Sequence, residues 1–551
     1  MTAPVQDGLL RGQGPGLGAV ALAHPFAERT MLHVLRRRAD DRRDHRWLVF
    51  DGEDTLTFGE AQSAVNRVAH AVVATVSPGA HIGLLLRNQV EFIPALYGTM
   101  AAASVGVPIN AEARGTVLHH VIEDSDIRIL ITRPDMLDRL RELDELAALE
   151  LIVVCDRSAG GLPAEIAGTP IVAWDAWQGG RAPSAPLDLP HAWDTATIQF
   201  TSGTTGRSKG AVYPHHFFYL YSATQADSQE RVADDVLTTP LPLYHAAALH
   251  HVAGAALHVG CTAHLSSKFS ASGFWPAAAD AGATFAIILG AMAQIMLKTV
   301  PVVPPHRLEH VFCVPPPPDI GAFERHFGVT LWWQGYGMTE ISPIPMPSRM
   351  EPDVPADTVG HPCSWFDYGV VDAHDLPVPT GEVGQLVFRP LIPHAMASEY
   401  YKRPDATVEA LRNGMFHTGD MATLDDAGRV HYRGRGSDRI RVRGENVTAA
   451  ELEAVACEHE VVLEAAAYAV PGEFGEDEIK LDVRCPDAID LAILHEWLTE
   501  RLPKFMVPRY LEQRTEFPRT GTQKIEKFRL AREPLERPTV VEFPPSRRSA
   551  T

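Results

Sequence analysis

The sequence predicts an α/β protein with a large N-terminal domain of α/β sheet layers, a β-rich subdomain and a small C-terminal α+β domain. Helical and strand-like segments alternate from Met31 onward, which favours largely parallel sheets. After Trp365 the pattern changes to short alternating strands separated by glycine and proline, and helices return from Ala449. At 551 residues the chain exceeds what one compact core normally holds, so at least two domains are expected.

The N-terminal domain combines apolar residues at helical spacing with short, largely apolar runs. The helical spacing predicts helices over 31–38 and 58–76. The apolar runs predict buried strands over 82–86, 127–132, 151–154, 197–200, 236–238, 285–289 and 329–333. Because buried strands that alternate with helices are typical of parallel sheets with helices on their faces, they predict α/β layers.

The later part of the chain is predicted to hold the β-rich subdomain and the C-terminal domain. Strands of the subdomain are expected over 367–371, 384–388 and 429–433. Helices 449–459 and 491–501 are expected around strands 465–469 and 479–483. We place the domain boundary at Asp438, with the N-terminal domain over 25–437 and the C-terminal domain over 438–533. The composition of residues 1–24 and 534–551 predicts disordered tails.

Charge and cysteine content narrow the function classes. The formal net charge of −20 would repel a nucleic acid, so no nucleic-acid partner is expected. The six cysteines lie far apart without a C-x-x-C pair, which predicts reduced thiols in a cytoplasmic protein rather than a disulfide frame or a zinc site. No run reaches the ~18 apolar residues of a membrane helix. Near the N-terminus no basic segment precedes an apolar run, so no secretory signal is expected.

A loop rich in glycine and hydroxyl groups follows the predicted strand 197–200. It reads Thr201-Ser202-Gly203-Thr204-Thr205-Gly206-Arg207-Ser208-Lys209-Gly210. Its glycines allow close backbone approach, so N–H groups, hydroxyls and two cations converge on one small volume, as a phosphate chain requires. The glycine spacing differs from that of a Walker A loop. Flexible surface loops share this composition, but the preceding strand and the ordered Thr-Thr-Gly-x-x-Lys-Gly core favour phosphate binding.

This loop resembles the phosphate loop of the adenylate-forming superfamily, which comprises acyl-CoA synthetases, carrier-protein adenylation domains and luciferases. A second matching segment is Gln334-Gly335-Tyr336-Gly337-Met338-Thr339-Glu340. The resemblance implies that Tyr336 lies against the adenine ring, with Gly337 giving it room. It further implies that Thr339 contacts the α-phosphate and that Glu340 binds Mg²⁺, a cation that prefers carboxylate and phosphate oxygens. Thr204 of the loop is assigned to the metal and to catalysis as well as to the nucleotide.

Two further motifs carry the resemblance toward the C-terminal domain. In His417-Thr418-Gly419-Asp420 the resemblance implies that Asp420 accepts hydrogen bonds from both ribose hydroxyls, and Arg435 resembles the arginine that also reaches the ribose. His417 is as easily structural as functional. Asp438 occupies the family's hinge position, which implies a mobile C-terminal domain. The resemblance implies that the segment containing Gly444 passes close to a pantetheine thiol, as glycine allows. Arg439, Arg441 and Arg443 alternate with apolar residues and also fit a solvated strand face.

The last motifs concern the acid substrate. Phe517-Pro518-Arg519-Thr520-Gly521-Thr522-Gln523-Lys524-Ile525 resembles the family's terminal motif, which implies that Lys524 is the catalytic cation of adenylation. Pro240-Leu241-Pro242-Leu243-Tyr244-His245 resembles the substrate-side motif, which implies that His245 lies near the acid or the thiol path. His250 and His251 follow, but a metal cluster there lacks cysteine or paired carboxylate partners. The implied co-substrates are ATP with Mg²⁺ and CoA.

Within the superfamily, several segments resemble carnitine/crotonobetaine-CoA ligases and related acyl-CoA synthetases. The segment Val314-Pro315-Pro316-Pro317-Pro318 departs from the family's pattern and predicts a stiffened acid pocket, because proline removes backbone donors. The sequence leaves three hypotheses open. The first is an acyl-CoA ligase, and the second is an adenylating ligase with a different acid or acceptor, such as a carrier protein, or nitrite delivered to an amine. The third is a non-catalytic nucleotide-binding relative. The presence of the motif residues argues against it: Lys209, Glu340, Asp420 and Lys524. A homodimer is compatible with the resemblance.

Overall fold

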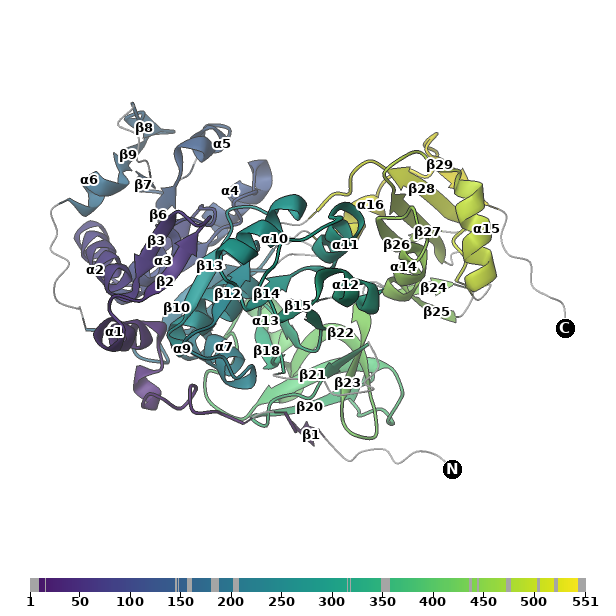
Figure 1. The fold of residues 1–551 in the computed structure, drawn as a ribbon, viewed down its shortest axis with the longest axis horizontal. Coiled ribbons are helices and arrows are strands. Elements are labelled where there is room, and N and C mark those ends of the chain that lie inside the picture. The colour runs from purple at the N-terminus through teal and green to yellow at the C-terminus, as the bar shows by residue number, and fades with distance from the viewer. Residues whose placement is uncertain are drawn as a thin grey trace.

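The chain forms a large N-terminal domain of several sheet layers and a smaller C-terminal domain beside it (Figure 1). The computed structural model describes residues 9–14, 16–143, 146, 148–155, 161–179, 188–201, 208–314, 316–317, 319–347, 357–435, 439–442, 445–471, 477–502, 506–519 and 524–543. The predicted α/β class is confirmed, since helices alternate with mostly parallel strands through the first 330 residues.

The first layer of the N-terminal domain is an eight-stranded sheet. Its order is β11 (Gly210–Pro214), β10 (Thr195–Phe200), β5 (Val105–Pro108), β4 (His81–Leu84), β6 (Ile127–Thr132), β7 (Leu151–Val154), β9 (Thr169–Ala173) and β8 (Glu165–Ile166). The strands from β10 to β9 pair in parallel, whereas β11 and β8 pair antiparallel at the edges. The predicted strands in this region are confirmed.

A seven-stranded sheet forms the second layer. Its order is β16 (Thr330–Trp332), β15 (His310–Cys313), β14 (Phe285–Ile288), β12 (Val236–Thr239), β13 (Thr262–Leu265), β2 (Arg46–Phe50) and β3 (Asp54–Thr57). All pairs are parallel except the β2–β3 hairpin. The chain therefore enters this sheet through a hairpin and returns to it only after completing the first layer.

Helices cover and separate these sheets. Those of the N-terminal domain are α1 (Met31–Asp41), α2 (Phe58–Thr75), α3 (Phe92–Ala101), α4 (Gly115–Asp124), α5 (Leu137–Arg141), α6 (Trp174–Gln178), α7 (His215–Ser228), α8 (Ala246–Ala248), α9 (Ala255–Val259), α10 (Ala271–Asp280), α11 (Gly290–Thr299), α12 (Ile320–Phe327) and α13 (Pro404–Ala410). Helix α2 begins with a capping box, in which Thr57 and Glu60 each satisfy a backbone N–H of the other. A π-helix, η3 (Leu249–Gly254), joins α8 to α9.

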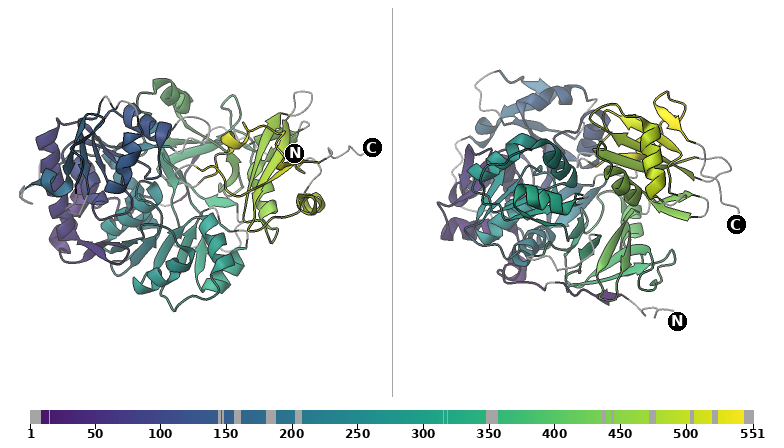
Figure 2. Two further views of the ribbon diagram at one scale, coloured as in Figure 1. Left: turned by 90° about the horizontal axis from the view of Figure 1, so that it is seen from above. Right: turned by 45° about the vertical axis from the view of Figure 1, so that its right-hand side comes forward.

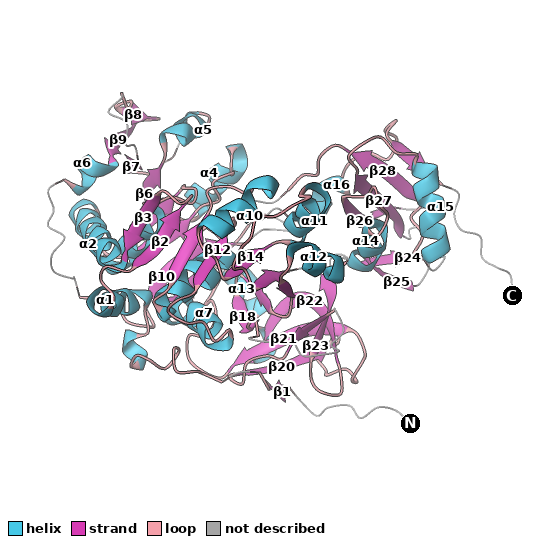
Figure 3. Ribbon diagram, in the orientation of Figure 1, coloured by secondary structure: helices cyan, strands magenta, loops and turns pink. Residues whose placement is uncertain are grey.

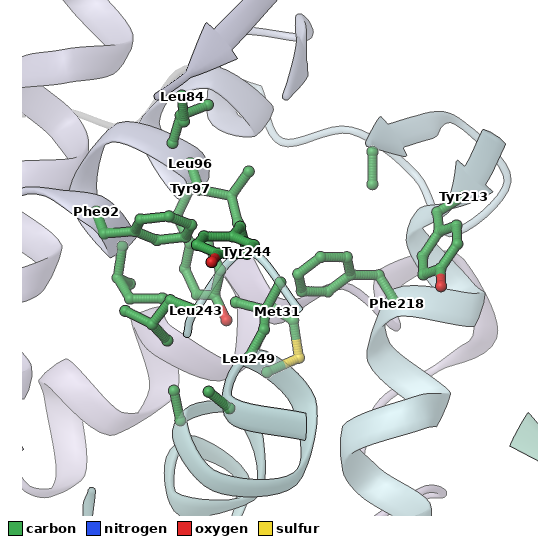
Figure 4. Packing of buried hydrophobic residues seen from close by; sticks show 14 of the residues in the cluster. Met31, Leu84, Phe92, Leu96, Tyr97, Tyr213, Phe218, Leu243, Tyr244 and Leu249 are labelled. Atoms are coloured by element: carbon green, nitrogen blue, oxygen red, sulfur yellow. The ribbon is translucent and has the colours of Figure 1, made fainter. Parts of the chain in front are cut away.

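Two helices lie wholly inside the N-terminal domain. All ten residues of α3 are buried, and so is α7 from His215 to Ala226. Figure 4 shows Phe92, Leu96 and Tyr97 of α3 packed near Phe218 of α7 and Leu249 of the π-helix. Helices that are apolar on all sides are typical of the interior of a large domain. The core therefore continues from one sheet layer to the other.

The β-rich subdomain is a six-stranded antiparallel sheet, which Figure 3 shows as a separate layer. Its order is β1 (Leu10–Arg11), β20 (Phe366–Val371), β21 (Gly384–Pro390), β22 (Phe416–Leu424), β23 (Val430–Arg435) and β19 (Thr358–Gly360). A short hairpin, β17 (Tyr336–Met338) and β18 (Ile341–Ile344), leads from the seven-stranded sheet toward this layer. The predicted change of texture after Trp365 is confirmed.

The C-terminal domain has its own core and is of the predicted α+β type. Its sheet runs in the order β26 (Glu464–Pro471), β27 (Asp477–Arg484), β28 (Tyr510–Arg514) and β29 (Val540–Glu542). Its helices are α14 (Ala449–Cys457), α15 (Leu491–Arg501) and α16 (Lys527–Leu530), and a separate hairpin joins β24 (Arg439–Val442) to β25 (Glu445–Thr448). A buried cluster of ion pairs joins the sheet, because Lys480 Nζ lies 3.1 Å from Asp482 and 2.7 Å from Glu512.

The C-terminal domain contacts the N-terminal domain through α11, where Lys298 Nζ donates to the carbonyl of Val462 at 2.9 Å. In Figures 1 and 2, α16 lies on the side of the C-terminal domain that faces the N-terminal domain, whereas the β24–β25 hairpin lies away from it. The orientation therefore turns α16, rather than the β24–β25 hairpin, toward the rest of the molecule.

Parts of both predicted disordered tails are ordered in the structure. Leu10 and Arg11 pair with β20, and the backbone N–H groups of Val20 and Ala21 donate to the carboxylate of Asp227 at 2.9 Å. At the other end β29 pairs with β28. Local composition does not reveal this order, because it comes from contacts with residues far away in the chain. Among the described helices, none has both the length and the apolar character needed to cross a membrane. None of the six cysteines, all of which the structure describes, forms a disulfide.

Candidate active site

The predicted phosphate loop connects two antiparallel strands, β10 and β11, at the edge of the eight-stranded sheet. Ser202, Gly203, Thr204, Thr205 and Gly206 lie outside the described residues. The two ends of the loop are held together, because the N–H of Thr201 donates to the carbonyl of Lys209 at 2.9 Å and the N–H of Lys209 donates to Thr201 Oγ1 at 3.1 Å. The exposed Lys209 ammonium lies 4.8 Å from the ring centroid of Tyr400. The loop is therefore anchored next to an aromatic ring that the motif itself does not contain.

Tyr400 connects this loop to the predicted metal ligand. The segment 398–401 runs along β11, since the N–H of Tyr401 donates to the carbonyl of Gly210 at 2.8 Å and that of Val212 to Glu399 at 2.9 Å. This pairing directs the Tyr400 hydroxyl to Glu340 Oε1 at 2.5 Å. Lys209, Tyr400 and Glu340 thus form a continuous series of contacts between a cation, an aromatic ring and a carboxylate.

Glu340 is a buried carboxylate with only 6% of its surface exposed. Burial raises its pKa, while the hydrogen bond from Tyr400 and the positive charges of Arg435 and Lys209 oppose the rise. A divalent cation beside Glu340 would act in the same direction as these charges. The donor set fits Mg²⁺, which binds one or two carboxylates together with phosphate oxygens.

The predicted ribose ligands meet at neighbouring strands of the β-rich subdomain. Asp420 on β22 lies opposite Arg435 on β23, and Arg435 Nε lies 2.9 Å from Asp420 Oδ1. Gly419 has a φ of +73°, a conformation that favours glycine and allows the turn before Asp420. The sequence motif is therefore explained by a backbone requirement as well as by the carboxylate.

Tyr336, which the resemblance places against the adenine ring, has two partners within the protein. Its hydroxyl donates to Asp420 Oδ2 at 2.5 Å, and its ring stacks on Phe388 with centroids 6.1 Å apart. Burial and the neighbouring Asp420 raise the pKa of Tyr336 well above its ordinary value, so the phenol is neutral and remains a donor. Burial lowers the pKa of Arg435, but the charge of Asp420 more than offsets this and its pKa lies above the ordinary value. Both oxygens of Asp420 thus have partners within the protein.

Gly337 and Thr339 lie between Tyr336 and Glu340 and approach α7 and β11 closely. A Cβ atom at Gly337 would lie 3.3 Å from the Tyr221 hydroxyl and 3.4 Å from the carbonyl of Ile341. The Tyr213 hydroxyl donates to the carbonyl of Thr339. The close approach explains the glycine, and the tyrosine contact ties the segment to the phosphate-loop hairpin.

The two predicted histidines occupy different surroundings. His245 is partly exposed at the start of α8 and contacts the ring of Tyr244, with centroids 4.6 Å apart. His417 Nδ1 lies 2.7 Å from Gln385 Oε1, and burial lowers the pKa of His417. Its side chain is therefore engaged within the β-rich sheet, which favours the structural interpretation.

Aromatic side chains surround Tyr221, whose hydroxyl lies next to Gly337. The ring of Tyr221 stacks on His250 with centroids 4.5 Å apart and lies 5.3 Å from His251. Burial lowers the pKa of His251 to about 3, so this imidazole is neutral. No group of three or more potential metal ligands occurs among the residues the structure describes. Pro315 and Pro318 of the predicted stiff wall lie outside that part of the chain.

Of the predicted site residues in the C-terminal domain, the structure describes Lys524. Lys524 is exposed and precedes α16. Asp438 and Gly444 lie outside the described residues, and the side chains of Arg439 and Arg441 are likewise not described. The structure thus brings together Lys209, Tyr336, Glu340, Asp420 and Arg435.

Sequence reasoning missed Tyr400, Tyr213 and Tyr221. Each acts through a contact with a residue far away in the chain, so no local motif identifies it. The pair Tyr400-Tyr401 before Lys-Arg-Pro was the available signal, because two adjacent tyrosines in a polar stretch are seldom both surface residues.

Comparison with known proteins bears on this site. Residues 35–401 match the family model of the AMP-binding enzyme, and residues 451–524 match that of the AMP-binding enzyme C-terminal domain. The chain is 29% identical over 491 residues to a crotonobetaine/carnitine–CoA ligase of Salmonella arizonae, covering 86% of this chain and 93% of that protein.

Two solved structures share the fold. A benzoate CoA ligase from Burkholderia xenovorans has a TM-score of 0.78 at 22% identity, covering 91% of this chain and 99% of that one. The o-succinylbenzoate CoA synthetase of Bacillus subtilis, in complex with ATP and magnesium ion, has a TM-score of 0.76 at 21% identity, covering 90% and 98%. The whole two-domain architecture is therefore shared.

Proposed function

Because this chain belongs to the AMP-binding enzyme family, we propose that it is an ATP-dependent ligase that adenylates a carboxylic acid and transfers the acyl group to CoA. The observation that carries this proposal is the convergence of Lys209, Glu340, Asp420 and Arg435 on one face between the phosphate-loop hairpin and the β-rich sheet. The two cations complement the negative phosphates of a nucleoside triphosphate, and the two buried carboxylates complement its metal ion and its ribose hydroxyls.

The first step joins the acid to AMP. An oxygen of the substrate carboxylate attacks the α-phosphorus of ATP, the bond from that phosphorus to the bridging oxygen breaks, and pyrophosphate leaves. Lys209 and the loop residues 201–206 hold the phosphates, Asp420 and Arg435 hold the ribose, and Thr339 contacts the α-phosphate. Mg²⁺, held by Glu340 and Thr204, supplies charge neutralisation when bound.

We assign to Lys524 the stabilisation of the negative charge that develops in this step. A cation positioned where negative charge accumulates stabilises the transition state more than the ground state. The orientation of the C-terminal domain supports this assignment, since the side that carries α16 faces the N-terminal domain (Figures 1 and 2).

The second step delivers the acyl group to CoA. The thiol sulfur attacks the acyl carbon, the bond to the AMP oxygen breaks, and the thiol proton passes to solvent. We assign the approach path to the Gly444 segment and His245, after rotation of the C-terminal domain at Asp438. Rotation must break the contact between Lys298 and Val462, so domain movement gates the second step.

Pyrophosphate release across a panel of acids, with and without CoA, tests the function. The panel includes benzoate, anthranilate, crotonobetaine, o-succinylbenzoate and nitrite. Acid-dependent release coupled to CoA consumption is expected. Release that ignores CoA, or that occurs only with nitrite or an amine acceptor, would replace CoA with another acceptor.

A further inference from the structure

Two ion pairs hold the flanks of the Lys524 segment. On one side, the guanidinium of Arg519 pairs with Glu464, the first residue of β26. On the other side, Lys527 Nζ lies 2.7 Å from Glu453 Oε1 on α14. The segment therefore has one carboxylate partner on each side, and the two partners belong to different elements of the C-terminal domain.

The backbone joins the same two flanks. Arg519 and Ile525 form an antiparallel bridge, and the N–H of Glu526 donates to the carbonyl of Pro518 at 2.8 Å. Ile525 packs against the small core that contains Phe517. Lys524 thus lies directly beside a fixed bridge, although its own side chain is exposed.

Each carboxylate is itself held in place. Glu464 Oε2 lies 2.5 Å from Arg484 Nε, and Glu453 Oε1 accepts the N–H of Ala467 at 2.7 Å. The side chains of Glu464 and Glu453 are 11% and 20% exposed. Partly buried carboxylates with a second partner are better defined in position than exposed ones, because an exposed pair is screened and mobile.

We propose that Glu453 and Glu464 are positioning residues for Lys524 in the adenylation step. The inference rests on the proposed function, in which Lys524 stabilises the transition state. Without the two carboxylates, α14 and β26 lose their ionic hold on the flanks, and the ammonium of Lys524 spends less time in the productive geometry. Such a loss lowers kcat of the step that uses Lys524 and leaves nucleotide binding by the N-terminal domain unchanged.

The experiment measures the two half-reactions separately in the full-length enzyme. We expect Glu464→Gln and Glu453→Gln each to slow acid-dependent ATP–pyrophosphate exchange about tenfold, and the double variant about hundredfold, since misplacement of a catalytic group by ~1 Å costs up to about that much. The KM for ATP should stay within about twofold, as should thioester formation from supplied acyl-adenylate. Glu478→Gln is the matched control, because Glu478 pairs with Arg509 at 3.2 Å between β27 and β28.

A double-mutant cycle separates positioning from general stabilisation. Arg519→Gln should slow exchange no more than Glu464→Gln, which also removes the pair with Arg484. Combining the two should cost no more than Glu464→Gln alone, since the contact between Arg519 and Glu464 is already lost. Trypsin cleavage after Lys524 should accelerate at least fivefold in the two glutamate variants but not in Glu478→Gln. This readout does not depend on activity.

The outcomes distinguish the inference from the function beneath it. If Lys524→Ala abolishes pyrophosphate exchange while the glutamate variants keep the wild-type rate, the positioning role is wrong and the function stands. If both half-reactions fall together in the glutamate variants, they act on folding and the inference is also wrong. If Lys524→Ala leaves exchange intact, the assignment of Lys524 itself fails.

Discussion

Tyr400→Phe is the sharpest test of the site, because it removes one oxygen and keeps the ring. The lost hydroxyl donates to Glu340 Oε1 at 2.5 Å, while the ring on which Lys209 lies remains. A hydrogen bond to a charged group contributes ~1.5–3 kcal/mol. Losing this hydrogen bond removes stabilisation of the ionised carboxylate, so the pKa of Glu340 should rise further above its ordinary value.

The sign of this effect follows from the state that Tyr400 stabilises. Burial already raises the pKa of Glu340, and the hydroxyl opposes that rise by favouring the ionised carboxylate. Metal binding needs the ionised form, so the acidic limb of kcat/KM should move to higher pH. A raised folded-state pKa contributes stability that is present below the unfolded pKa and lost as pH rises through the folded value. The stability cost of Tyr400→Phe should therefore appear at neutral rather than acidic pH.

The assay is pyrophosphate release against pH at several Mg²⁺ concentrations, with an acid that the enzyme accepts. Tyr401→Phe is the control, since the neighbouring hydroxyl donates to Asp126 at 2.8 Å rather than to Glu340. The control should leave the acidic limb in place. An unmoved limb in Tyr400→Phe would refute the reasoning, because Glu340 would then not depend on this hydroxyl.

Four further changes address the remaining assignments. Lys524→Ala should abolish adenylation and leave thioester formation from supplied acyl-adenylate nearly intact, and equal loss in both half-reactions would contradict its role. Asp420→Ala should raise the KM for ATP at least about tenfold, since it removes an acceptor of charge-assisted hydrogen bonds; an unchanged KM would mean that the ribose assignment is wrong. Tyr336→Phe frees one oxygen of Asp420, so the KM for ATP should fall, and a rise would show that the hydroxyl serves the nucleotide directly. Ending the chain before Arg537 removes strand β29 and the ion pair between Arg537 and Glu512. This truncation should lower the free energy of unfolding of the C-terminal domain by ~2–4 kcal/mol, measured by urea denaturation.

The sequence predicts regular elements well where burial alone determines them. The largely apolar runs 127–132 and 151–154 became β6 and β7 with the same bounds. Segments whose order depends on distant partners were missed: Leu10 pairs with Tyr368, and Val540 with Glu512. The π-helix Leu249–Gly254 was missed as well, because an apolar run does not distinguish one kind of helix from another.

The candidate site shows the same division between local and distant information. Glu340 and Asp420 are candidates from the sequence alone because each sits in a short motif with its own backbone requirement, and their assigned roles stay predictions. Tyr400 could not, since its partners Lys209 and Glu340 come from other parts of the chain. The contact between Tyr336 and Asp420 was also unforeseen, because a buried carboxylate takes whichever donor the folded chain brings to it.

The site forms from residues that are synthesised at different times: Lys209, Glu340, Tyr400 and Arg435. This affects when the growing chain becomes able to bind a nucleotide. The α/β sheets are complete once the chain has passed Trp332, and domains generally fold as units as the chain emerges. Tyr400 and the Asp420–Arg435 pair emerge only later. A nascent chain that already holds both α/β layers is therefore expected to lack nucleotide affinity until β23 pairs with β22.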